Sequence, residues 1–169
     1  MALNVVSNAG PLMVFSKLNI LHLLKGLYGR IEFPLSVYRE TVSVGIRRGF
    51  MDAQLLNSFL VQNEWNPIKD FEISVDLRNL NLDRGEKESI ALALSKNALL
   101  LMDNERGRDF ARQNNLSVRG SLGVLIEAFA KKMISEDQLR FYFRQISERK
   151  DIWINPDLCV RLLEQIFGP

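Results

Sequence analysis

The chain has 169 residues, of which 47% are hydrophobic and 25% charged, as in an ordinary soluble globular protein. Its formal net charge of +2 at pH 7 allows nucleic-acid binding without requiring it. The single cysteine, Cys159, excludes an internal disulfide framework and a cysteine-rich zinc site. We expect Cys159 to be a small buried side chain on the last helix.

One domain is expected to take up residues 1–169, with about 133–169 as a helical C-terminal extension. The N-terminal sequence lacks the basic and long apolar segments of a signal peptide. No apolar stretch reaches the roughly 18 residues that a membrane span requires. These features predict a cytoplasmic protein.

The first half of the chain alternates short apolar strands with helices. A strand at residues 3–7 leads to a turn at Gly10 and Pro11, followed by a helical stretch at 12–28 that breaks near 17–19. The remaining elements expected here are a strand at 30–33, a helix starting after Pro34, a helix at 51–61 and, because of Pro67, only an edge strand at 65–69.

The second half begins with a helix that Asp83 is expected to cap and that runs to residue 96. The most apolar run of the chain, residues 98–102, follows as a strand. The remaining elements are a helix at 105–114, a strand at 116–118 and helices at 121–132, 135–148 and 156–167. This alternation of strands and helices predicts an α/β sandwich over a parallel sheet.

Oxygen-bearing side chains follow two of these strands. Asn8 comes directly after the first strand, and Asp103 ends the most apolar one. Because ligands bind at the carboxyl ends of strands in open α/β sheets, we expect both residues at one edge of the sheet. Their oxygens suit a hard divalent cation. Two structural explanations stay open: Asn8 can form a turn, and Asp103 can cap the next helix.

Two glutamates add carboxylates on predicted helices. Glu40 flanks the apolar stripe of its helix, and a solvated surface position is the alternative. Glu86 lies at helical spacing from Ile90 and Ala93, which predicts that it heads a buried stripe, where an unsatisfied carboxylate is costly. The alternative for Glu86 and Glu88 is the preference of acids for a helix N-terminus. Glu88 is predicted to point away from Glu86, so Glu86 is favoured.

Four blocks of the sequence carry a family resemblance. They are residues 5–12, 33–40, 82–93 and 100–108, and the likeness continues through 117–125 and into the helical tail at 152–158. In order and spacing these blocks resemble the PIN-domain nucleases, and most of all a prokaryotic branch related to VapC-type toxins. The resemblance implies a three-layer α/β/α sandwich around a mainly parallel sheet, with a helical C-terminal tail.

The resemblance also implies a ribonuclease that uses Mg²⁺ or Mn²⁺ to cut RNA. Asn8 stands where the first catalytic aspartate of the family usually lies. An amide oxygen can bind magnesium, but it brings no charge and cannot act as a base, so weakened metal binding is expected. By position, the catalytic and metal-binding residues are Glu40, Glu86 and Asp103, with Asn8 as a further metal ligand and Glu88, Asn104 and Ser121 as secondary residues.

Basic residues near the last acid are candidates for binding RNA phosphates. They are Arg106, Arg108, Arg112 and Arg119, and solvated side chains are the alternative. The only histidine, His22, lies in an apolar helical stretch, which argues against a metal-free ribonuclease with paired histidines.

Two other functions are weighed against the nuclease. A nuclease fold that has lost catalysis would bind RNA or a protein partner, and Asn8 supports this alternative. A phosphatase with an aspartyl-phosphate intermediate is disfavoured, because no Asp-x-Asp pair follows the first strand. If the toxin analogy holds, a small antitoxin protein covers the acidic residues. A homodimer is a further expectation, through the apolar helix near residues 55–61 or the tail, and no membrane partner is expected.

Overall fold

The computed structural model describes residues 3–169 and divides into two units, one up to Ser121 and one from Leu122 to Pro169. The strands of the first unit are β1 (Val5–Ser7), β2 (Leu99–Leu101) and β3 (Val118–Arg119). Its helical elements are α1 (Ala9–Lys17), α2 (Leu21–Tyr28), α3 (Leu35–Tyr38), η1 (Arg39–Ser43), α4 (Val44–Arg47), α5 (Met51–Gln62), α6 (Val75–Arg78), α7 (Arg84–Lys96) and α8 (Glu105–Gln113). The chain continues as α9 (Ser121–Ala130), α10 (Glu136–Glu148) and α11 (Pro156–Phe167).

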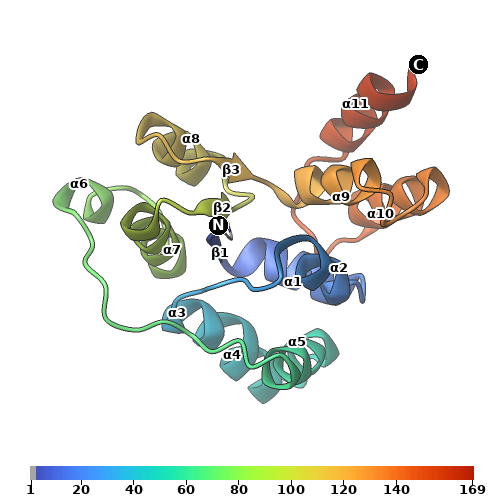
Figure 1. Ribbon diagram of the computed structural model, residues 1–169. Coiled ribbons are helices and arrows are strands. Elements are labelled where there is room, and N and C mark those ends of the chain that lie inside the picture. The colour runs from blue at the N-terminus through green and yellow to red at the C-terminus, as the bar shows by residue number, and fades with distance from the viewer. Residues whose placement is uncertain (1–2) are drawn as a thin grey trace. The chain divides into compact units, whose positions relative to one another are not determined.

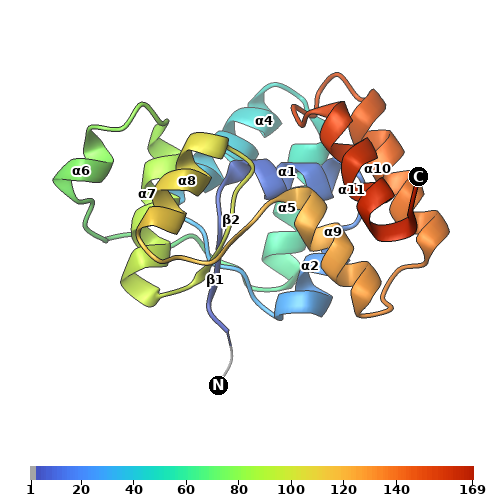
Figure 2. The same cartoon turned by 90° about the horizontal axis from the view of Figure 1, so that it is seen from above.

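The strands of the first unit form a parallel sheet in the order β1-β2-β3. Val6 lies opposite Leu100, and both side chains are fully buried, as expected for parallel strands that are covered on both faces. Figures 1 and 2 show these strands between α7 and α8 on one side and α1 on the other. The α/β fold with a parallel sheet, predicted from the sequence, is therefore confirmed.

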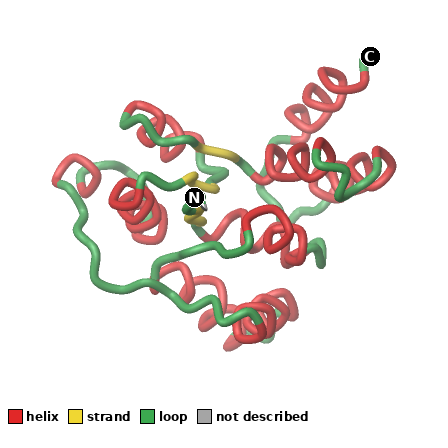
Figure 3. Tube along the Cα trace, viewed as in Figure 1, coloured by secondary structure: helices red, strands yellow, loops and turns green. Residues whose placement is uncertain are grey.

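Single bridges rather than full strands extend the sheet beyond β1. Val6 bridges to Glu32 and Pro34 bridges to Ile68, both in parallel. The two strands predicted in this part of the chain are thus reduced to isolated bridges. Pro34 and Pro67 lack the N–H groups that a longer ladder would need. Figure 3 shows how short the strands are between the helices and loops.

The start of α1 differs from the prediction. Gly10 and Pro11 lie inside the helix rather than in a turn before it. Proline is tolerated in the first helical turn, since an N–H there has no helical partner. The predicted break between the first two helices is present, and Asn19 between them has a left-handed φ of 56°.

The helix predicted after Pro34 is one helical run with an irregular centre. α3 passes into the π-helical turn η1 and then into α4. Thr41 Oγ1 donates a hydrogen bond of 2.8 Å to the carbonyl oxygen of Val37, four residues earlier. Such π-turns inside helices often occur at functional sites, and this one carries Glu40.

Asp83 caps α7 as predicted. Its Oδ1 accepts a hydrogen bond of 2.7 Å from the Glu86 backbone N–H, and Glu86 Oε2 accepts one of 3.0 Å from the Asp83 N–H. Together these bonds form a capping box. The short helix α6 was not predicted, although Ser74 caps it by accepting a hydrogen bond from Leu77 N–H. A single turn leaves little periodicity in the sequence.

The helices of the second unit begin where the sequence predicted. Ser135 caps α10 through a capping box with Gln138, and Asn155 caps α11 ahead of Pro156. Cys159 is 2% exposed, which confirms that it is a buried side chain on the last helix. Within residues 3–169, no helix combines the length and the apolar character needed to cross a membrane.

Gly45 is required by the close packing of α4 against α5. A Cβ at this position would lie 2.5 Å from the Cβ of Ala53, which is fully buried. We therefore expect Gly45→Ala to destabilise the protein by about 1–3 kcal/mol through overpacking, measured by thermal unfolding. Gly26→Ala is the matched control, because Gly26 is exposed within α2 and alanine favours the helix there. Equal melting temperatures for the two variants would contradict this account.

Candidate active site

Asn8 lies at the junction of β1 and α1. It occupies the N-cap position of α1, where asparagine ordinarily accepts a hydrogen bond from the first helical turn, but its side chain makes no such bond. Asn8 is 5% exposed, and its Oδ1 is buried without a hydrogen-bond partner among the described residues. A buried, unsatisfied oxygen is costly, so the turn or cap explanation for Asn8 is not supported.

Asp103 follows β2, next to β1 in the sheet. Its two carboxylate oxygens accept hydrogen bonds from Ser121, one of 2.7 Å from the backbone N–H and one of 2.6 Å from Oγ. Burial raises the pKa of the Asp103 carboxyl above its ordinary value of 3.8, and the Ser121 bonds and the Arg108 charge offset this only in part. Ser121 therefore fixes the orientation of a carboxylate that burial would otherwise tend to neutralise.

Asp103 does not cap the next helix. That position belongs to Asn104, whose Oδ1 accepts a hydrogen bond of 2.9 Å from the Gly107 N–H. The Asp103 carboxylate is therefore not used for helix capping, and it lies at the edge of the sheet. Asn104 was predicted as a secondary site residue, and the structure gives it a capping bond.

Gly10 marks the place where the Asn8 and Asp103 oxygens come together. A Cβ at position 10 would stand 3.4 Å from Asp103 Oδ2 and 3.5 Å from Asn8 Oδ1. Both oxygens therefore lie against the same side of Gly10. This brings together the two residues that the sequence placed at the strand ends, as predicted from the parallel sheet.

Glu40, on η1, belongs to a group of acids that also includes Asp83 and Glu86. Partial burial raises the pKa of Glu40, and the negative charges of Asp83 and Glu86 raise it further. The pKa of Glu86 is raised mainly by burial, while its bond to the Asp83 N–H lowers it. Asp83 was predicted only as a helix cap. Its direct proximity in sequence to Glu86 was the signal that could have placed it here.

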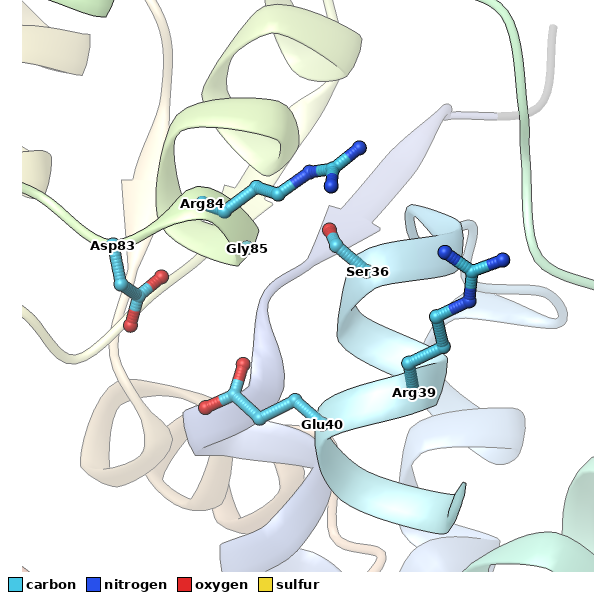
Figure 4. A pocket seen from close by; sticks show the side chains of 6 residues that line it. All are labelled: Ser36, Arg39, Glu40, Asp83, Arg84 and Gly85. Atoms are coloured by element: carbon cyan, nitrogen blue, oxygen red, sulfur yellow. The ribbon is translucent and has the colours of Figure 1, made fainter. Parts of the chain in front are cut away.

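Figure 4 shows the carboxylates of Glu40 and Asp83 turned toward the same space between η1 and the start of α7. Both residues line a cavity of about 320 Å³ together with Ser36, Arg39, Arg84 and Gly85. A Cβ at Gly85 would lie 3.1 Å from Glu40 Oε2 and 3.5 Å from Asp83 Oδ1. The glycine therefore allows the two helices to bring their acids together.

The buried carboxylate of α7 is that of Glu88, not that of Glu86 as the spacing predicted. Glu88 is 9% exposed, whereas Glu86 is only half-buried. The prediction was wrong because every residue from Glu88 to Ala93 is buried, so α7 has no single buried stripe. Glu88 accepts hydrogen bonds from Ser36 Oγ and, at 2.8 Å, from Arg84 Nε.

The four arginines predicted to bind phosphate have different surroundings. Arg108 lies beside Asp103, and its Nε is buried without a hydrogen-bond partner among residues 3–169. Arg112 pairs with Asp109 at 3.3 Å, and Arg119 Nη1 donates a hydrogen bond of 3.3 Å to the Tyr28 hydroxyl. Arg106 is exposed. Of the four, only Arg108 is placed next to a predicted catalytic acid by these contacts.

Comparison with known protein families identifies the family of the chain. A family model described as a PIN domain matches residues 4–167 of the chain. The chain belongs to the PIN-domain family. No curated protein matches it. PIN domains are generally nucleases, and such nucleases generally use divalent metal ions, so this PIN domain has the fold of a hydrolytic enzyme.

The donor set of this PIN domain fits a hard divalent cation. The unsatisfied Asn8 Oδ1 and the Asp103 carboxylate lie against the same side of Gly10, and both are oxygen ligands of the kind that Mg²⁺ prefers. Within residues 3–169, no three His, Cys, Asp or Glu side chains gather closely enough to hold a metal ion among them. Because Mg²⁺ keeps several waters and commonly takes substrate phosphate as a ligand, a sparse protein shell is compatible with it.

The raised pKa of Glu40 leads to a stability prediction. When the pKa of a carboxyl is higher in the folded than in the unfolded protein, the folded state loses stability as the pH rises from the ordinary pKa of 4.5 through the raised pKa. Glu40→Gln should therefore raise the melting temperature slightly at pH 7 in EDTA, and the gain should vanish below pH 4. The gain is small because Glu40 is only partly buried, so solvent screens its repulsion from Asp83 and Glu86.

Divalent cations should reverse the order of the melting temperatures of the natural protein and Glu40→Gln. Mg²⁺ should raise the melting temperature of the natural protein more than that of Glu40→Gln, because an ion stabilises the state that binds it. Glu148→Gln is the control, since Glu148 is an exposed acid in the second unit. A Glu40→Gln protein that melts lower than the natural one in EDTA would show that the acids do not repel one another.

Proposed function

We propose that this PIN domain is an endoribonuclease that depends on Mg²⁺ or Mn²⁺. The observation that carries the proposal is the buried Asn8 Oδ1, which has no hydrogen-bond partner among the described residues and lies against the same side of Gly10 as the Asp103 carboxylate. A bound cation would satisfy this oxygen. The position at the carboxyl ends of β1 and β2 is where ligands bind in open α/β sheets.

The side chains proposed to hold one or two ions are those predicted from the sequence. They form two pairs, Asn8 with Asp103 and Glu40 with Glu86, and Ser121 orients Asp103. When bound, the ion lowers the pKa of a coordinated water and neutralises charge on the scissile phosphate. Arg108, whose Nε is buried and unpaired among the described residues, would donate to a phosphate oxygen. His22 is exposed on α2, so it is not part of this constellation.

The test is cleavage of a mixed RNA pool in the presence of Mg²⁺, Mn²⁺ or EDTA. We expect internal cuts with either metal and none in EDTA. Equal cutting in EDTA would rule out metal dependence. A parallel incubation with single-stranded DNA of the same sequences tests whether RNA is the substrate.

We further propose that the ribonuclease acts as the toxin of a toxin–antitoxin pair in the cytoplasm. This extension rests on the resemblance to VapC-type toxins. A small antitoxin would cover the acidic residues, and a homodimer would use exposed apolar residues of α5 such as Met51 and Val61, which are 66% and 69% exposed. Induced expression should arrest growth, and Asp103→Asn should relieve the arrest.

A second candidate function is RNA binding without cleavage. It is favoured by the uncharged amide at Asn8 and by the lack, in the described part of the chain, of three metal-binding side chains gathered at one point. In the same RNA pool this function predicts retention of intact RNA with every metal. Metal-dependent cutting would reject it.

A further inference from the structure

Two hollows adjoin at the acidic site. The first, which Glu40 and Asp83 line, shares Ser36, Arg39 and Arg84 with a second hollow of about 320 Å³. The second is lined by Leu35, Ser36, Arg39, Ile68, Lys69, Asp70, Phe71, Arg84 and Glu88. Because the shared residues belong to both, a chain-like ligand can extend from the acids into the second hollow.

The first hollow is electrically polarised along its length. Figure 4 shows the carboxylates of Glu40 and Asp83 at one end, while the guanidinium groups of Arg39 and Arg84 extend away from them on either side of Ser36. A metal-bound phosphate suits the acidic end, and a second phosphate suits the cationic end. Nucleic acid supplies phosphates at regular spacing.

The second hollow combines cations with an aromatic ring. Arg39, Arg84 and Lys69 contribute three positive charges, and Asp70 and Glu88 contribute two negative ones. Glu88 pairs with Arg84 at 2.8 Å, which leaves Arg39 and Lys69 against the single charge of Asp70. The half-buried ring of Phe71 lies in the same lining. Cations beside an aromatic face are what single-stranded nucleic-acid sites use.

Arg84 and Arg39, which line both hollows, differ in whether another side chain orients them. Arg84 is oriented by Glu88, which Ser36 holds in turn through a hydrogen bond to its other oxygen. The Arg84 side chain nevertheless remains 77% exposed, so its outer nitrogens stay accessible. The Arg39 side chain is exposed and makes no ion pair or hydrogen bond with any residue that the structure describes. A positioned cation and an unpaired one thus face the same space.

We propose that the second hollow is a subsite for the nucleotide next to the scissile phosphate. Arg39 and Lys69 hold its phosphate, with Arg84 beside them, and its base stacks on Phe71. The subsite rests on the proposed function for the position of the scissile phosphate. It requires an unstacked base, so it selects single-stranded nucleic acid over a duplex.

The test measures binding rather than cleavage. A fluorescently labelled single-stranded RNA oligonucleotide of mixed sequence is titrated with the natural protein and its variants in EDTA, with fluorescence anisotropy as the readout. Arg39→Gln and Lys69→Gln should each weaken binding and lower the slope of log K against log salt by about 0.7, the loss of one phosphate contact. Phe71→Leu should weaken binding about fivefold or more without changing that slope.

Two matched control variants test whether these effects are specific to the subsite. Arg48→Gln removes an exposed arginine at the end of α4, and Phe141→Leu removes an aromatic ring that is 51% exposed on α10. Both should leave binding unchanged. Because Phe71 also packs against the core, its variant is accepted only if it melts near the natural protein, and Lys69→Gln supplies an exposed alternative.

The outcomes separate this subsite from the proposed nuclease activity. Weakened binding by the subsite variants supports the subsite even if the natural protein cuts no RNA. The subsite would be overturned if Arg39→Gln, Lys69→Gln and Phe71→Leu bound the RNA with the affinity and salt dependence of the natural protein. This holds even if metal-dependent cleavage is confirmed. Equal affinity for a duplex of the same sequence would also overturn it.

Discussion

Asp103→Asn is expected to reduce metal-dependent RNA cleavage by about a hundredfold or more. The substitution removes the negative charge that lies beside Asn8 and Gly10. It should leave the fold intact, because burial already raises the pKa of this carboxyl and so disfavours its charge. The asparagine Oδ1 can still accept the Ser121 N–H, and the Ser121 hydroxyl can turn to accept from the amide. Initial rates over a range of Mg²⁺ concentrations measure the effect.

Asp109→Asn is the matched control for this variant. Asp109 is an exposed acid on α8 that forms an ion pair with Arg112 at 3.3 Å. The Asp109→Asn protein should cut RNA at the rate of the natural protein. Unfolding of Asp103→Asn would be visible as a loss of helical circular dichroism. A folded Asp103→Asn protein that retains natural activity would show that the catalytic centre lies elsewhere in the chain.

The sequence predicted the site best where strand topology decides the geometry. Asn8 and Asp103 are 95 positions apart in the numbering, yet each follows a buried apolar run. Parallel pairing of β1 with β2 then places both at one edge of the sheet. This reasoning needs only the strand ends, and short apolar runs identify those.

Helix faces were predicted less well because burial on α7 is not one-sided. The spacing of Glu86 from Ile90 suggested a buried stripe, but α7 contacts α3, α8 and β1 and is covered on more than one side. Glu88 rather than Glu86 is therefore the buried acid. The partner that satisfies Glu88 is Ser36, 52 positions away, and no local pattern indicates such a contact.

Two further features depend on tertiary packing that the sequence does not display. The π-turn η1, which carries Glu40, looks like ordinary helix in its hydrophobic pattern. The role of Ser121 came from the family resemblance, whereas its two hydrogen bonds to Asp103 appear only in the structure. The orphaned Asn8 Oδ1 is likewise a property of the folded chain, since an asparagine before a helix ordinarily caps it.

Asn8→Asp is expected to strengthen metal binding and to increase cleavage at limiting Mg²⁺. The side chains have the same shape, so the new carboxylate would take the place of an oxygen that is buried and has no partner among the described residues. It would also add the charge that the amide lacks. This negative charge favours binding of the divalent ion that the proposed cleavage of a P–O bond requires. The Mg²⁺ concentration at half-maximal rate should fall, and Asn66→Asp, at an exposed position, should not change it.

The same substitution should destabilise the metal-free protein. Two carboxylates would border the space at Gly10 without a cation between them, and an uncompensated buried charge costs on the order of 3 kcal/mol. The new acid should have a raised pKa, so the loss of stability should be present at pH 7 and disappear as the pH falls through that value. Thermal unfolding in EDTA and in Mg²⁺ should therefore show a lowered melting temperature that the metal restores. If Mg²⁺ stabilises Asn8→Asp no more than the natural protein, Asn8 does not face a cation, and the proposed metal site is wrong.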